Sequence, residues 1–145
     1  MKLAKSKLKG QIAMEFITVF FLIFVIFVFI QTRTFTITSS LSQQSTVVQA
    51  VKLLDESETL ISLTSHSTAL SSQFYLPPFL QDGSNYIFKV SNSSVSITWN
   101  STTGLRSLVR SLYAYNIINS TGASNFDLGS GNHFIKKFDG GVMIS

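Results

Sequence analysis

The fold of this chain is decided near its N-terminus, where residues 9–30 read KGQIAMEFITVFFLIFVIFVFI. Residues 12–30 are apolar except for Glu15 and Thr18. At a helical rise of about 1.5 Å per residue, this run extends roughly 28 Å, which is close to the ~30 Å hydrocarbon core of a bilayer. The stretch therefore predicts a single membrane-spanning helix.

A basic segment precedes the apolar run and sets its expected orientation. Residues 1–10 carry four lysines and no acid, whereas Arg33 is the only cation shortly after the run. Because lysine and arginine gather on the cytoplasmic side, this asymmetry predicts a cytoplasmic N-terminus and an exterior location for the bulk of the chain. The run is longer than the ~7–15 residues of a secretory signal, and no small-x-small cleavage site follows Ile30.

The junction between the two segments carries the motif Lys9-Gly10-Gln11-x-Ala13-x-Glu15-Phe16. This motif resembles the class III leader of archaeal type IV prepilins, whose usual form is Lys-Gly-Gln-x-Ser-x-Glu-Phe. The resemblance implies that a prepilin peptidase cuts between Gly10 and Gln11, so that residues 1–10 are removed. Ala13 stands where the family often has serine. Gln11 matches neither the phenylalanine of bacterial pilins nor the glycine-rich start of archaeal flagellins, which favours the archaeal pilin-like branch.

Glu15 separates two interpretations of the span. A carboxylate at the centre of a membrane helix is unfavourable by about 2.5–3.5 kcal/mol on insertion scales, and by less near an edge, so such acids are rare and usually paired. In a plain signal anchor, Glu15 would be accidental. The resemblance instead implies that the acid at the fifth mature position meets the free amino group of a neighbouring subunit and sets the axial register.

Composition limits the size and character of the region beyond the span. The chain has 145 residues, of which 45% are hydrophobic and 12% charged, which describes a membrane-linked chain with one small globular domain. The net charge of +4 lies wholly in residues 1–10, since the rest carries seven cations and seven acids. The charge is therefore no argument for nucleic-acid binding. The absence of cysteine removes the usual stabiliser of small exterior domains.

The span is expected to continue as a long helix over residues 11–72. Residues 11–76 contain neither glycine nor proline. Beyond residue 30, apolar side chains recur near one stripe, at Ile37, Leu41, Val48, Val51, Leu54 and Ile61. Dense serine and threonine over residues 34–46 predict a kink or soft stretch, residues 47–63 are a better helix, and Ser71-Ser72 marks the expected end.

Residues 73–145 predict an antiparallel sheet. Residues 86–90 and 95–99 alternate apolar and polar side chains, and a second hairpin joins residues 134–138 to 142–144 through Asp139-Gly140-Gly141. Residues 105–118 are ambiguous, with a strand expected from about Leu108, and residues 121–132 are expected to form a loop. Packing of the sheet on the helix gives an α+β fold with a small extracellular head, as the resemblance to type IV pilins also implies.

No enzymatic site is apparent. The two histidines, His66 and His133, have no acid or serine partner in a nucleophile or metal motif. Residues 55–58 read as a solvated acidic face, and residues 82–85 as a turn, since they lack the further acids of a calcium loop. We expect no catalytic residue, no metal, no cofactor and no nucleic-acid partner.

Three N-glycosylation sequons occur in the half predicted to be exterior, at Asn92, Asn100 and Asn119. A region this rich in serine and threonine produces some sequons by chance, so the excess is small. The sequence predicts that at least one of them is glycosylated in a host that has the transferase.

The expected function is structural: a major or minor pilin of an archaeal type IV pilus-like surface filament, made as a single-pass membrane precursor. The implied partners are a prepilin peptidase, the membrane, and copies of the chain or related pilins. The alternative is a membrane-anchored adhesin or receptor that does not polymerise. Five aromatic residues could form its binding surface: Tyr75, Tyr86, Trp99, Tyr113 and Tyr115.

Overall fold

The computed structural model describes residues 2–66, 71–113 and 116–145, with side chains in the first helix described from Met14 onward. In these residues, one helix, α1 (Lys2–His66), is followed by eight strands: β1 (Ser71–Leu76), β2 (Tyr86–Ser91), β3 (Ser94–Ser101), β4 (Gly104–Ser111), β5 (Ile117–Asn119), β6 (Asn125–Leu128), β7 (Gly131–Phe138) and β8 (Gly141–Ile144). The chain divides into two compact units, Met1–Leu41 and Ser42–Ser145. The layout is α+β, as expected, with a long N-terminal apolar helix before a region of mainly antiparallel strands.

The first unit consists of the N-terminal part of α1. Residues 34–46, where dense serine and threonine predict a kink or soft stretch, are assigned as helix throughout. Six hydroxyls, from Thr32 to Ser40, donate hydrogen bonds of 2.9 Å to backbone carbonyls three or four residues earlier. Each hydroxyl has its hydrogen-bond partner within the same helix, so these serine and threonine side chains do not interrupt the helix.

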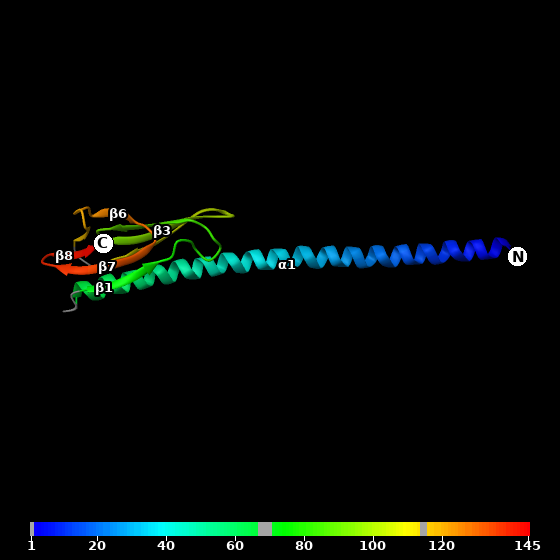
Figure 1. Cartoon of the computed structure of the whole chain (residues 1–145), viewed down its shortest axis with the longest axis horizontal. Coiled ribbons are helices and arrows are strands. Elements are labelled where there is room, and N and C mark those ends of the chain that lie inside the picture. Colours follow the sequence, from blue (N-terminus) through cyan, green and yellow to red (C-terminus); the bar gives the residue numbers. More distant parts are fainter. Residues whose placement is uncertain (1, 67–70, 114–115) are drawn as a thin grey trace. The chain divides into compact units, whose positions relative to one another are not determined.

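The second unit holds two four-stranded sheets, with strand orders β1-β7-β8-β5 and β4-β3-β2-β6. Figure 1 shows the strands lying alongside the C-terminal part of α1, which belongs to the same unit. Both expected hairpins are present: Tyr86 lies opposite Trp99 in the pair β2–β3, and Phe138 lies opposite Gly141 in the pair β7–β8. Gly140 in the second turn has a φ of 109°, which glycine adopts without steric cost.

Three expectations for the sheets are wrong. Residues 121–132 are not all loop, because they contain β6 and the start of β7. The strand expected from Leu108 begins earlier, at Gly104. The sheets are not wholly antiparallel, because β5 pairs with β8 in parallel. Both β5 and β6 are short strands that pair with distant segments, so local alternation carries little signal for them.

The hydrophobic core of the second unit lies between α1 and the inner faces of both sheets. Ala50, Leu54 and Ile61 of α1 are fully buried. They join buried residues of both sheets: Phe74, Leu76, Phe88, Val90, Val95, Ile97, Trp99, Ile117, Ile135, Val142 and Ile144. This shared core is the packing of sheet on helix that the size of the head requires.

The buried face of α1 differs from the expected apolar stripe. It includes three hydroxyl residues, Thr46, Ser57 and Thr64, each bonded to a carbonyl of its own helix. Val48, expected on the stripe, is instead 67% exposed. Val48 and the buried Leu54 are six residues apart, which at about 100° per residue places them roughly 120° apart around the helix, so they do not share one face.

The helix ends at His66, earlier than the expected end near Ser71-Ser72, which instead begin β1. Thr64 and Ser72 share a hydrogen bond of 2.6 Å across the connection.

Candidate functional site

The membrane-length segment exposes a continuous run of large apolar side chains. The large apolar side chains from Met14 to Ile30 are 43–71% exposed. The described residues contain one helix long and apolar enough to cross a membrane, with a mean hydropathy of 2.5 over its most apolar window and none of that window buried. This agrees with the expected single-pass membrane protein.

Two polar residues interrupt this segment, and they differ in how their polar atoms are satisfied. Thr18 donates a hydrogen bond of 2.8 Å to the carbonyl of Met14, so its hydroxyl is compatible with an apolar environment. The carboxylate of Glu15 is exposed and has no hydrogen bond or ion pair with any residue described from Met14 onward. Glu15 is therefore the polar group in this segment that lacks a described partner.

The expected processing site lies earlier in the helix. The backbones of Gly10 and Gln11 fall within the bounds of α1, but their side chains are outside the described part of the chain. Cleavage between them stays a prediction from the motif.

The three sequons have different surroundings. The amide oxygen of Asn92 accepts a hydrogen bond of 2.8 Å from the backbone of Ile117, which ties the β2–β3 turn to β5. The amide oxygen of Asn119 accepts bonds from Thr121 and Ala123 and so organises its own loop. Asn100 is exposed near the end of β3, opposite Leu105, with no hydrogen bond from its side chain to another described residue.

We therefore expect Asn100 to carry most of any N-linked glycan in a host that has the transferase. The hydrogen bonds accepted by the amide oxygens of Asn92 and Asn119 fix the orientation of these side chains, whereas Asn100 can turn its amide nitrogen, the atom that carries the glycan, toward the transferase. Glycopeptide mass spectrometry should find Asn100→Gln to lose most of the added mass. A glycan on every copy of Asn119 and on no copy of Asn100 would contradict this prediction.

The aromatic residues considered for an adhesin differ in exposure and in their place in the fold. Trp99 is 3% exposed in the core. Tyr86 is half-buried, its hydroxyl donates a hydrogen bond of 2.5 Å to the carbonyl of Pro77, and burial raises its pKa to about 12. Tyr75 lies on β1 and Tyr113 follows β4, in different sheets, while Tyr115 is outside the described residues.

Two titratable side chains outside the helix, Asp82 and His133, form local hydrogen bonds. The described residues contain no group of three side chains able to hold a metal ion. Asp82 accepts hydrogen bonds from the backbone and hydroxyl of Ser84, so residues 82–85 form the expected turn. Partial burial acts to raise the pKa of Asp82, but its hydrogen bonds together, with those from Ser84 the largest among them, outweigh burial and hold the pKa below its usual value. His133 bonds the carbonyl of Gly129 at 2.8 Å.

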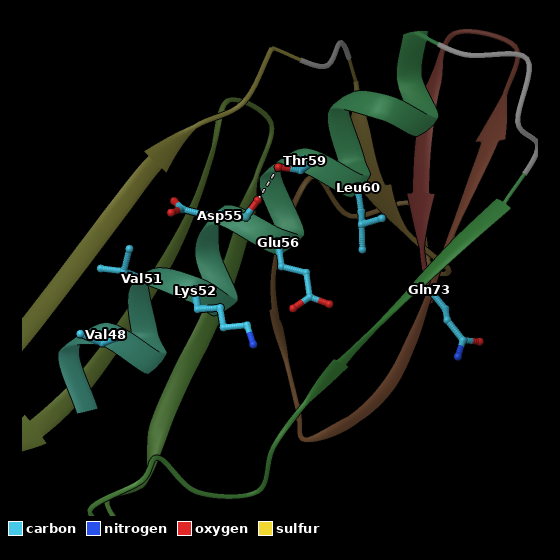
Figure 2. A pocket seen from close by; sticks show the side chains of 8 residues that line it. All are labelled: Val48, Val51, Lys52, Asp55, Glu56, Thr59, Leu60 and Gln73. Carbon is cyan, nitrogen blue, oxygen red and sulfur yellow. Dashed lines mark hydrogen bonds between the residues drawn. The ribbon is translucent and has the colours of Figure 1, made fainter. Parts of the chain in front are cut away.

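An open groove beside α1, which the sequence interpretation missed, is shown in Figure 2. Its volume is about 870 Å³, and eight residues line it: Val48, Val51, Lys52, Asp55, Glu56, Thr59, Leu60 and Gln73. Seven of them belong to α1 and recur every three or four residues, so they form one helical face, and Gln73 comes from β1. That spacing, with apolar residues at both ends and charges between, is the signal that could have identified the groove.

The charges of the groove are unevenly engaged. Asp55 forms an ion pair of 2.8 Å with Arg110 of β4. Glu56 is exposed and has no ion-pair partner among the residues the structure describes.

A comparison of the chain with protein families, with curated proteins and with solved structures finds no match in any of the three.

Proposed function

We propose that this chain is the structural subunit, a major or minor pilin, of an archaeal type IV pilus-like surface filament. In this proposal a prepilin peptidase removes residues 1–10, and the mature chain leaves the membrane by packing its apolar helix among copies of itself or related pilins. The head then faces the exterior. No catalytic step is assigned to the chain.

The observation that carries the proposal is the exposed apolar segment from Met14 to Ile30, combined with the motif at Gly10. A helix that is apolar all round satisfies its own backbone, so it is stable both in lipid and among other apolar helices. The motif places the expected cut before this segment, and the mature protein therefore keeps it. A secretory signal would lose it.

The first test is the N-terminus of the mature protein. We expect mass spectrometry of membrane and filament fractions to find a chain that begins at Gln11. In Gly10→Phe a bulky side chain occupies the position before the cut, and we expect only the intact precursor. Finding only uncut chain in the wild type would remove the main support for the proposal.

Electron microscopy of cells with and without the chain completes this test. We expect surface filaments that contain the processed chain and disappear when Gly10→Phe is the only copy. A chain that is cut, reaches the surface and never enters a filament would favour the alternative, a membrane-anchored adhesin or receptor.

A further inference from the structure

A small hollow lies at one end of the sheet β4-β3-β2-β6, where β2 and β4 begin and β3 ends. Its volume is about 180 Å³, and Asn100 of β3 is one of the residues that line it. Val95, Ile97 and Trp99 of β3 are buried, and side chains alternate along a strand. The side chain of Asn100 therefore lies on the outer face of the sheet, away from the core.

Two exposed apolar side chains flank Asn100 on this outer face. Leu105 lies directly opposite it on β4 and is 73% exposed. Ile87 of β2 lies opposite Thr98, which makes it the diagonal neighbour of Asn100 on the other side, and it is 56% exposed. Directly opposite Cβ atoms are ~4.5–5.5 Å apart and diagonal ones ~7–8 Å, so both side chains are within reach of a group attached to Asn100. Both also line the hollow.

The polar groups of the hollow include amides that are not engaged by the fold. Asn85, which precedes β2, lines the hollow and is exposed. Neither Asn85 nor Asn100 forms a side-chain hydrogen bond with another residue that the structure describes. The hollow thus combines apolar walls with a few available amide groups, which is the usual composition of a small-molecule site.

One occupant is selected by its point of attachment. Asn100 begins the sequon Asn100-Ser101-Thr102, so a glycan on its amide nitrogen starts from the lining of the hollow itself. A tethered group has a high effective concentration, so weak contacts are enough to hold it in place. The C–H groups of a sugar ring can cover apolar side chains, and its hydroxyls can bond an amide. The hollow is smaller than the ~300–1,000 Å³ of sites for drug-sized ligands, so it suits about one ring.

We propose that the first sugar of an N-linked glycan on Asn100 packs into this hollow, against Leu105 and Ile87, and thereby stabilises the folded head. The unfolded chain carries the same glycan but has no hollow, so the contact favours the folded state alone. This inference rests on the exterior head of the proposed function, and it does not depend on filament assembly.

A stability cycle tests the contact in the detergent-solubilised full chain. Wild type and variants are prepared from a host that has the transferase and from one that lacks it, and unfolding is followed by the fluorescence of Trp99. We expect the glycan to raise the folded-to-unfolded ratio of wild type about threefold or more, read from the shift in denaturant midpoint. In Leu105→Ser this gain should disappear, because the apolar wall of the hollow is lost.

The matched control is Val109→Ser, which changes the same strand. Val109 is 56% exposed on the outer face, opposite Ser96, and does not line the hollow. It should keep the full gain from the glycan. Glycans on the other sequons contribute equally to all three chains, so they cancel in the comparison. A gain that is absent in wild type, or equal in Leu105→Ser, overturns the inference.

Nuclear magnetic resonance gives a second readout that does not depend on stability. In the glycosylated chain, the methyl groups of Leu105 and Ile87 should show nuclear Overhauser contacts to the first sugar, whereas those of Val109 should show none. The unglycosylated chain is then titrated with free N-acetylglucosamine. Shifts of these methyl groups with the free sugar, without contacts to the attached one, would assign the hollow to an external sugar and overturn the inference.

The two proposals fail in different ways. A chain that is unmodified at Asn100 in a host with the transferase, or modified there without the stability gain, overturns the inference alone. Filaments formed by that chain would leave the proposed function intact. Cells that lack filaments, but whose chain carries a stabilising glycan at Asn100, would remove the proposed function and keep this inference.

Discussion

A chain with Glu15→Ala will reach the membrane and lose residues 1–10, yet it will enter filaments poorly when it is the only copy. Replacing the carboxylate removes an insertion penalty that reaches about 2.5–3.5 kcal/mol at a bilayer centre and is smaller near an edge, so insertion should be unchanged or easier. Assembly should suffer because the proposed partner of Glu15, the amino group of Gln11 in a neighbouring subunit, would be buried without a counter-charge.

The loss should be at least about tenfold in filament yield, since an unpaired buried charge costs several kcal/mol. Immunoblots of membrane and sheared filament fractions measure it. Thr18→Ala is the matched control, because it removes a polar group from the same segment whose hydroxyl is already bonded to Met14. Assembly of Glu15→Ala at the wild-type level would show that Glu15 does not set the register.

The second large effect is expected in the head, where Phe88→Ala should destabilise the fold by about 3–5 kcal/mol. Phe88 is fully buried on β2, between β3 and β6, and its ring centre lies 6.2 Å from that of Phe74. Removing the ring leaves a cavity that strands paired on both sides can fill only in part. A domain stable by ~5–15 kcal/mol would lose a large share of that stability.

Trp99 provides the measurement, since it is the only tryptophan and is 3% exposed. Its fluorescence in the detergent-solubilised full chain reports unfolding of the core as denaturant is added. The control is Ile87→Ala, the adjacent residue on the outer face, which is 56% exposed and should shift stability by about 0.5 kcal/mol or less. Equal midpoints for Phe88→Ala and wild type would contradict the assigned core.

The parts of the fold that can be predicted from the sequence are those with local signals. The long helix follows from the absence of glycine and proline, and both hairpins follow from alternation next to a turn. Strand β6 escapes sequence-based prediction because its four residues pair with β2, more than thirty residues earlier. The parallel pairing of β5 with β8 likewise depends on contacts that no local pattern encodes.

Some of the candidate sites can be predicted from the sequence, whereas the groove cannot. Glu15 and the sequons are found by residue type and position alone, and the structure adds only their surroundings. The groove needs the structure, because the apolar stripe in the sequence places Val48 and Val51 on the buried face. The true buried face uses Thr46, Ser57 and Thr64, whose hydroxyls are satisfied by the helix and therefore pack like small apolar side chains.

The row of helix-bonded hydroxyls from Thr32 to Ser40 has a consequence for transfer out of the membrane. Because each hydroxyl proton is already donated to a carbonyl, this segment needs few bonds from water, headgroups or protein. Its free energy therefore changes gradually between these environments. In the proposed assembly, a subunit drawn out of the bilayer would therefore meet no abrupt barrier from these hydroxyls, and the helix could adjust its position in small steps until Glu15 reached its proposed partner.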